Sequence, residues 1–321
     1  MEQNKLKSLL RSNENIKLLW DKVMWMYAKS KLHINDYDYT NNQFMKIVGK
    51  ELNLEHPTTF SEKLQYLKLK ARNPLITDCT DKVKVRDYVI SCGYEHILNK
   101  VYGVFEIFDS VDFDFMPERF FIKCNHMSGA NYYWDKLKSN NYKLLKKKFD
   151  FYMKKNFYVM QREWNYKNIK PMIICEQILE DKNGHFPKDY KFFCFNGEPK
   201  LLMYCEGLCN EKGERGHAMC NFYDMDFILL DLKINNDKIT TRVIEKPQNF
   251  EEMQKIARVL SAPFPFSRVD LYNLEGKIVF GELTFYHAAG LNIISPERWE
   301  SVMGSWLDIK DYVSVDEIGK D

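Results

Sequence analysis

Charged side chains alternate with apolar ones along two neighbouring segments near the C-terminal end of the sequence. Arg268, Asp270 and Tyr272 form the first set, and Glu282 and Thr284 form the second. Alternate residues of a strand point to the same face, so a hairpin of these segments would gather two carboxylates and a guanidinium. A salt-bridge cluster at a sheet edge would explain this pattern. A Mg²⁺ site would explain it equally well, because Mg²⁺ takes one or two carboxylates together with phosphate oxygens.

A lysine followed by a small-residue loop forms a second group. Lys123 ends an apolar segment, and Ser128 and Gly129 lie in the loop after it. Backbone N–H groups of such a loop can point at anionic oxygens, and the lysine adds a positive charge. The pattern suits a phosphate-binding lid, although a lysine beside a turn is common. His126 in the same loop is either a phosphate contact or a structural residue.

A third group follows another apolar segment. Glu176, Gln177 and Leu179 end a run that reads as a strand, and Asp189 and Lys191 come about ten residues later. A strand edge with free backbone groups can bind the edge of an adenine, and a nearby carboxylate can hold ribose hydroxyls. Alone, this signal is weak.

Two hairpins and one helix are expected to position these groups. Residues 190–195 and 200–205 flank an Asn-Gly turn, and residues 268–272 and 277–285 flank a second turn ending in glycine. Residues 249–260 have the pattern of an amphipathic helix.

Residues 1–75 read as helical. Apolar residues at three- and four-residue steps predict one helix face, which is either a membrane contact or, as we expect because this is more common, part of the core: Ile16, Leu19, Trp20, Val23, Met26 and Tyr27. Helices in front of sheets predict an α+β protein, with a helical region at 1–75 and sheet-bearing lobes at 76–180 and 181–321.

Composition excludes several classes of protein. The net charge of +2 gives no overall field for nucleic acid, and no segment resembles a signal peptide or a membrane span. We therefore expect a cytoplasmic protein whose eight cysteines are reduced. The residue types of Cys205, Cys209, His217 and Cys220 suit zinc, but their spacing fits no standard zinc pattern, so cysteines buried in strands are favoured.

The order of these groups resembles the ATP-grasp superfamily. More closely, residues 60–68 (FSEKLQYLK), 189–197 (DYKFFCFNG) and 281–285 (GELTF) are similar to the TupA-like ATP-grasp family, which is associated with bacterial surface-polysaccharide gene clusters. The resemblance covers roughly residues 57–310. It implies an ATP-grasp fold, in which two α+β lobes clamp ATP, behind the helical N-terminal region.

The resemblance also implies a role for each residue. Lys82 and Lys123 would hold ATP phosphates beneath the lid at Ser128 and Gly129. Glu176, Gln177 and Leu179 would match the adenine hinge, and Asp189 the ribose carboxylate. Asp270 and Glu282 would bind Mg²⁺, with Thr284 as the candidate third ligand at a position where many members have asparagine. Arg268 would be catalytic, as would Lys191, whose role the resemblance does not define.

The implied activity is an ATP-dependent carboxylate–amine ligase that works through an acyl phosphate. By family association, it would join an amino acid to a uronic acid of a surface glycan or its precursor. If that acceptor is lipid-linked at the inner membrane face, the protein would associate peripherally with the membrane, and the N-terminal helical segment is the candidate docking surface. Two rivals remain, a phosphotransferase on the same fold and a glycosyltransferase using the D-x-D motif at Asp224 and Asp226.

Overall fold

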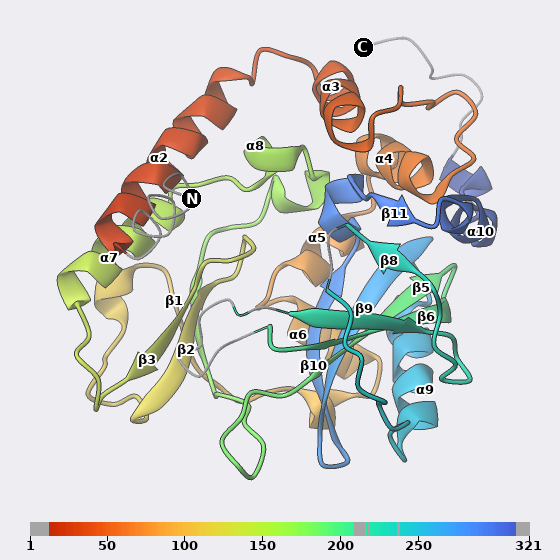
Figure 1. The fold of residues 1–321 in the computed structure, drawn as a ribbon. Coiled ribbons are helices and arrows are strands. Elements are labelled where there is room, and N and C mark those ends of the chain that lie inside the picture. The colour runs from red at the N-terminus through yellow and green to blue at the C-terminus, as the bar shows by residue number, and fades with distance from the viewer. Residues whose placement is uncertain (1–12, 209–215, 217, 236–237, 313–321) are drawn as a thin grey trace, which may run out of the picture.

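The computed structural model of the chain describes residues 13–208, 216, 218–235 and 238–312, and Figure 1 shows its fold. The helices and strands follow in this order: α2 (Glu14–Ser30), α3 (Asp36–Val48), α4 (Phe60–Lys70), α5 (Pro74–Thr80), α6 (Val85–Ser91), β1 (Val101–Phe105), β2 (Arg119–Cys124), β3 (Asn131–Asp135), α7 (Tyr142–Tyr152), α8 (Tyr158–Gln161), β4 (Ile173–Glu176), β5 (Asp189–Phe195), β6 (Glu198–Glu206), β7 (Met219–Tyr223), β8 (Lys233–Ile234), α9 (Phe250–Ser261), β9 (Phe266–Leu274), β10 (Lys277–Thr284), β11 (Ile294–Ser295) and α10 (Arg298–Trp306).

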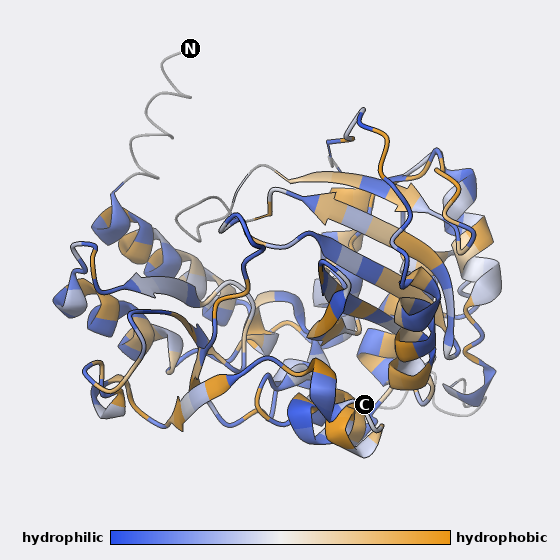
Figure 2. Ribbon diagram, turned by 90° about the horizontal axis from the view of Figure 1, so that it is seen from below, coloured by the Kyte–Doolittle hydropathy of each residue, from blue (hydrophilic) through white to orange (hydrophobic). Residues whose placement is uncertain are grey.

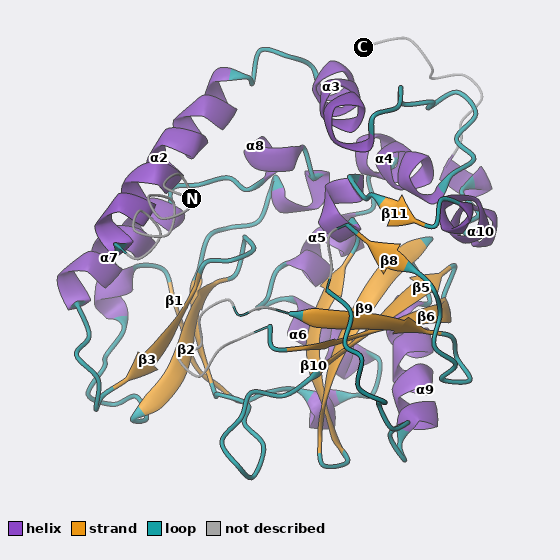
Figure 3. Cartoon of the chain, viewed as in Figure 1, coloured by secondary structure: helices purple, strands orange, loops and turns teal. Residues whose placement is uncertain are grey.

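Two antiparallel sheets carry most of the strands (Figure 3). The first has the order β1-β4-β2-β3, and the second has the order β10-β9-β5-β6-β7. A short pair of strands, β8 and β11, joins residues 233–234 to residues 294–295. The helices before residue 100 and the two sheets together give the α+β arrangement expected from the sequence.

Tight turns close both hairpins of the second sheet. Asn196 and Gly197 have φ values of 47° and 82°, and Glu275 and Gly276 have φ values of 53° and 98°. Positive φ at both central residues is the type I′ geometry, whose twist matches that of paired strands. The Asn-Gly signal therefore places the β5–β6 turn correctly, and β9 and β10 form the second predicted hairpin.

Each sheet has its own hydrophobic core. Helix α9 packs on β5, β6 and β9, and its buried face includes Met253, Ile256 and Leu260. Helices α4, α5 and α6 contribute to the same core, while α7 packs with the first sheet. The strands of the second sheet carry much of the hydrophobic colour in Figure 2. The domain boundaries at residues 75 and 180 stay predictions.

Helix α4 connects the front of the chain to its C-terminal part. Thr59 and Glu62 form a capping box at its start. Within the helix, Gln65 Nε2 donates to the carbonyl oxygens of Ala289 and Gly290, at 3.1 and 2.6 Å. Additional bonds from the same helix reach the α10 region: Ser61 to Glu300, and Lys63 to the carbonyls of Gly304 and Leu307. The FSEKLQYLK segment therefore links the N-terminal helices to residues 289–307, and we call it the joint at α4.

The apolar stripe of α2 does not lie in the core, contrary to expectation. All six residues of the stripe are exposed: Ile16, Leu19, Trp20, Val23, Met26 and Tyr27. The helix instead turns Ala28 and Trp25 inward, where they pack with Tyr158 and Val159. Helical periodicity identified an apolar face correctly, but a second apolar face of the same helix makes the contacts.

The expectation of reduced cysteines is also wrong for one pair. Cys205 on β6 lies directly opposite Cys220 on β7, and the two form a disulfide. Both are buried strand residues, as expected, but the cross-strand register brings their side chains together. Cys209 and His217 lie outside the described residues. Across the described residues, no helix is long and apolar enough to span a membrane.

Candidate functional site

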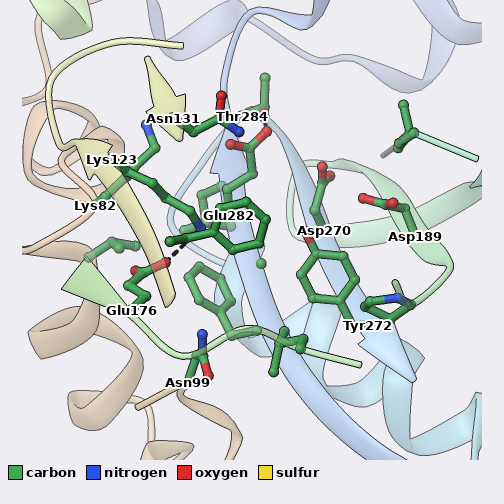
Figure 4. A pocket seen from close by; sticks show the side chains of 18 of the residues that line it. Lys82, Asn99, Lys123, Asn131, Glu176, Asp189, Asp270, Tyr272, Glu282 and Thr284 are labelled. Carbon is green, nitrogen blue, oxygen red and sulfur yellow. Dashed lines mark hydrogen bonds and ion pairs between the residues drawn. The ribbon is translucent and has the colours of Figure 1, made fainter. Parts of the chain in front are cut away.

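A cavity of about 320 Å³ lies between the two sheets (Figure 4). Strands β2 and β4 contribute one wall, and β5, β9 and β10 contribute the other. The sequence-predicted residues that line it are Lys82, Lys123, Glu176, Gln177, Leu179, Asp189, Lys191, Asp270, Glu282 and Thr284. Groups spread over some 200 residues of sequence therefore meet around one space.

The acidic wall of the cavity depends on the register of β9 and β10. Asp270 pairs with Glu282 and Arg268 pairs with Thr284, after an irregularity at Gly281. A Cβ atom at Gly281 would lie 2.9 Å from the carbonyl oxygen of Asp270. Only glycine allows this close approach, which brings the Glu282 side chain to the same face as Asp270.

Arg268 lies behind this wall and ties it together. Its Nε and Nη2 donate to the two carboxylate oxygens of Asp270 at 2.6 and 2.7 Å, and Nη2 also donates to Glu282 Oε1 at 3.1 Å and to Thr284 Oγ1 at 3.0 Å. The salt-bridge cluster considered from the sequence therefore exists. It also holds both carboxylates within 3.1 Å of one nitrogen, so they converge as a shared cation would require.

Lys191 completes the cluster from β5. Its Nζ donates to Asp189 Oδ1 at 2.9 Å and to Asp270 Oδ2 at 2.6 Å. Burial opposes the charge on Lys191, but Asp270 and Asp189 outweigh it and raise the lysine pKa. Burial likewise opposes ionisation of Asp270, yet Arg268 and Lys191 keep its pKa below the ordinary value. For Asp189 burial prevails, and its pKa is raised. The wall is thus a buried network of alternating charges.

His287 is a member of this network that the sequence did not reveal. Arg268 Nη1 donates to His287 Nδ1 at 2.6 Å, and burial with the nearby arginine charge lowers the histidine pKa to about 3. The imidazole is therefore neutral and accepts a hydrogen bond that orients Arg268. Because His287 follows β10 in a short 3-10 turn, no strand periodicity connects it to Arg268.

The opposite wall carries two lysines. Lys123 on β2 forms a 2.6 Å ion pair with Glu176 on β4. Lys82 lies in the turn between α5 and α6, where its Nζ donates to the Met127 carbonyl at 2.8 Å. Burial lowers the Lys82 pKa. Both lysines line the cavity that Asp270 and Glu282 face, as Figure 4 shows.

The loop after β2 lies beside the cavity. Ser128 and Gly129 are exposed, and neither belongs to its lining. Gly129 has a φ of 76°, so this position favours glycine. His126 is buried, with Nε2 3.2 Å from the Tyr152 carbonyl, which matches the structural interpretation of this residue.

One part of the cavity is apolar, and most of its residues were missed by sequence reasoning. Gln177 forms a backbone hydrogen bond to Lys100, and its carbonyl accepts from Asn99 Nδ2 at 2.8 Å. Near this hinge the lining is aromatic or aliphatic: Leu179, Phe186, Pro187, Leu208, Tyr272 and Phe280. Flat apolar walls beside hinge backbone suit a planar ring system. These residues lie in loops and strands whose apolar character looks like ordinary core in the sequence.

The donor set can be compared with what a cation needs. No group of three or more His, Cys, Asp or Glu side chains within the described ranges is arranged to hold a metal. The two carboxylates of Asp270 and Glu282 therefore form a partial site, which fits Mg²⁺ when phosphate oxygens and water supply the other ligands. The Thr284 hydroxyl donates to Glu282 at 3.1 Å, so it supports that carboxylate.

The D-x-D segment has a different local role. The Asp224 carboxylate accepts hydrogen bonds from the backbone N–H groups of Asp226 and Ile228, at 3.0 and 2.8 Å. This closes a turn after β7, and neither aspartate belongs to the cavity lining. The arrangement gives no support to a glycosyltransferase site.

Comparison with solved structures found several ligases. They include L-amino acid ligase from Bacillus licheniformis (12% identity, 72% of this chain, 50% of that chain, TM-score 0.41) and the ATP complex of D-alanine–D-alanine ligase from Bacillus anthracis (13%, 64%, 55%, TM-score 0.37). A third is phosphoribosylamine–glycine ligase from Thermotoga maritima (10%, 65%, 48%, TM-score 0.39). The match spans about half the length of each of these proteins. No curated protein matched the chain.

Comparison with family models found a match over most of the sequence. The model described as TupA-like ATPgrasp matches residues 62–308. That range includes both sheets and every predicted site residue. The chain therefore belongs to the TupA-like ATP-grasp family and has the ATP-grasp fold.

Proposed function

We propose that the protein is an ATP-dependent carboxylate–amine ligase. The observation that carries the proposal is the meeting, around a single cavity, of two lysines from one wall with paired carboxylates from the other, which an arginine holds from behind. An anionic triphosphate needs cations around its oxygens, and a bound divalent cation needs carboxylates. Both sets are present at the same place, and membership in the family supports this assignment.

In this proposal the adenine occupies the apolar part of the cavity, at the hinge of Glu176, Gln177 and Leu179. Asp189 holds the ribose, and the triphosphate extends toward Lys82 and Lys123. Lys123 is already oriented by its ion pair with Glu176. The exposed loop with Ser128 and Gly129 would then cover the phosphates by moving toward the cavity.

Asp270 and Glu282 would hold Mg²⁺ with the phosphate oxygens. Bound there, the ion would neutralise charge on the β- and γ-phosphates. The protein's own contribution is to keep Asp270 ionised through Arg268 and Lys191, and to leave the half-exposed Glu282 accessible from the cavity.

The reaction has two balanced steps. A carboxylate oxygen of the substrate attacks the γ-phosphorus, and the bond from that phosphorus to the β-phosphate oxygen breaks, which gives an acyl phosphate and ADP. An amine then attacks the acyl carbon, phosphate leaves, and the amine loses a proton to give the amide. Phosphoryl transfer depends mainly on positioning the reactants and stabilising the negative charge of the phosphates. In this proposal Lys82, Lys123 and Lys191 provide both. Arg268, which lies behind the carboxylates and outside the cavity lining, would assist by holding Asp270 and Glu282 in place.

For substrates we propose an amino acid as the amine and a uronic acid of a bacterial surface glycan, or its precursor, as the carboxylate. The family's association with polysaccharide gene clusters supports this choice. We place the enzyme in the cytoplasm because the reaction needs ATP. The Cys205–Cys220 disulfide does not follow from that location, since disulfides are rare in reducing compartments.

The test is to trap the acyl phosphate. Purified protein is incubated with ATP, Mg²⁺ and pools of uronic acids, without amine and with hydroxylamine. A hydroxamate should form, because an acyl phosphate acylates hydroxylamine whereas a phosphate monoester does not. With amino acids in place of hydroxylamine, ADP, free phosphate and amide should appear in equal amounts.

The controls separate the ligase from the phosphotransferase. Arg268→Ala should yield less hydroxamate, and so should omission of ATP. A stable phosphorylated product with neither hydroxamate nor free phosphate would show that the protein is a kinase. Stabilisation by a UDP-sugar and not by ATP would instead favour a glycosyltransferase.

A further inference from the structure

Helix α2 presents an exposed apolar stripe, which consists of Ile16, Leu19, Trp20, Val23, Met26 and Tyr27. The exposed fractions are 62% for Leu19, 63% for Trp20 and 61% for Met26. Their spacing of three and four residues places them on one face over most of the helix. Single exposed apolar residues are ordinary, but a continuous stripe of six large ones marks an interaction surface.

The opposite face of α2 fixes the helix to the protein. Trp25 and Ala28 pack with Tyr158 and Val159 near α8. The two acidic residues of the helix are both engaged: the partly exposed Glu14 pairs with Lys148 of α7 and with Lys17 of α2, and Asp21 accepts from the Tyr152 hydroxyl at 3.3 Å. Helix α2 lies beside α7 at the outer edge of the molecule (Figure 1).

The charges around the stripe are positive. Lys22 and Lys29, seven residues apart, flank it on one side, and neither forms an ion pair with any described residue. Lys17 flanks the other side. Lys22 lies 5.8 Å above the ring of Phe151, which places it at the junction with α7. The stripe is therefore bordered by lysines. Lys17 is paired with Glu14 at 3.3 Å, whereas Lys22 and Lys29 keep unpaired charges among the described residues.

This charge pattern indicates what kind of partner the stripe binds. In a symmetric pairing of two copies through the stripe, the lysine borders would meet lysine borders, and neither carboxylate of α2 pairs with Lys22 or Lys29 to neutralise them. An anionic lipid surface offers both complements at once: headgroup phosphates for the lysines and an acyl boundary for Leu19, Trp20 and Met26.

We propose that α2 binds the surface of an anionic membrane through this stripe, with the helix lying in the plane of the interface. Trp20 and Tyr27 are suited to the headgroup level, because their rings are amphipathic. This surface is separate from the cavity and the proposal does not depend on the ligase reaction. It would bring the cavity close to any carboxylate acceptor that is attached to lipid.

The test is sedimentation of the full-length protein with vesicles. Vesicles of equimolar phosphatidylcholine and phosphatidylglycerol should bind it, whereas pure phosphatidylcholine should bind at least ~10-fold more weakly, and added salt should weaken binding to the anionic vesicles. Leu19→Ser/Trp20→Ser should reduce binding to anionic vesicles at least ~10-fold, and Lys22→Glu/Lys29→Glu should do so as well.

The matched control is Ile107→Ser/Ile228→Ser, whose side chains are similarly exposed at 58% and 61% but lie elsewhere. It should bind like the wild type, and circular dichroism should show every variant folded. Failure of the wild type to bind anionic vesicles would overturn the proposal, as would equal losses in the stripe variant and the control. If light scattering shows a lipid-free dimer that Leu19→Ser/Trp20→Ser converts to a monomer, the stripe is a self-association surface instead.

Discussion

Asp270→Asn should destabilise the protein as well as inactivate it, whereas Glu282→Gln should mainly inactivate it. The Asp270 side chain is 3% exposed and accepts three charge-assisted hydrogen bonds, two from Arg268 and one from Lys191. The Glu282 side chain is 50% exposed and accepts from Arg268 at 3.1 Å. The two carboxylates therefore share a proposed role in binding Mg²⁺ but differ in their structural role.

The magnitude follows from the charge balance. Arg268 and Lys191 are buried cations, balanced by the buried carboxylates of Asp270 and Asp189. A neutral amide in place of the Asp270 carboxylate would leave one buried positive charge uncompensated, and breaking a buried pair in this way costs about 3–5 kcal/mol. For Glu282→Gln the loss should stay below about 1 kcal/mol, since solvent screens an exposed pair. Turnover should fall at least ~100-fold in both variants.

Urea unfolding followed by circular dichroism measures the loss of stability, and the rate of ADP release measures the loss of turnover. Asp270→Glu is a useful third variant, because it keeps the charge while misplacing it. Equal free energies of unfolding for Asp270→Asn and Glu282→Gln would refute the charge-balance reasoning. Near wild-type turnover in both would remove the pair from the proposed site.

Three further predictions concern other parts of the site and the fold. The His287 pKa is lowered from 6.5 to about 3, so between these pH values the unfolded chain binds one more proton than the folded protein. The free energy of unfolding, measured with urea, should therefore fall as the pH drops from 6.5 to about 3. It should fall less in His287→Asn. Lys123→Met should weaken ATP binding at least ~10-fold in calorimetry, whereas Lys138→Met, outside the cavity lining, should bind like the wild type; equal affinities would contradict the phosphate role. Gly290→Ala should cost ~2 kcal/mol or more, since its Cβ would lie 2.7 Å from Gln65 Nε2 at a φ of 72°, and Gly93→Ala, with a φ of 84° and open space, should cost only ~1 kcal/mol; the reverse order would be inconsistent with the clash.

Local sequence patterns predicted the structure correctly where one hairpin alone determines the geometry. The period of two along 268–272 and 282–284 placed Arg268, Asp270 and Glu282 on one face, and the turn residues between β9 and β10 made them partners. The residues of the opposite wall, Lys82, Lys123 and Glu176, were predicted from the order of the motifs and the resemblance to the family, because no local pattern connects them to β9 and β10. The hairpin prediction needs no knowledge of distant segments.

Features that depend on tertiary contacts could not be read in the same way. The stripe of α2 and the inward face with Trp25 and Ala28 are both apolar, so periodicity alone could not say which face has a partner. His287 reaches Arg268 from a turn with no regular pattern. The disulfide of Cys205 and Cys220 depends on the register of β6 and β7, and the residues between them give no signal for it.

The joint at α4 has a consequence for how the chain is made. Gln65 finds its partners Ala289 and Gly290 only 224 and 225 positions later, and Lys63 finds Leu307 after 244. At a synthesis rate of ~5–20 residues per second, α4 leaves the ribosome on the order of 10–50 s before these partners do. During that time Phe60 and Leu64, which are buried in the folded protein, lack the C-terminal residues that cover them. A chain held on a ribosome stalled before residue 289 should therefore be cut by protease around α4 more readily than the full-length protein.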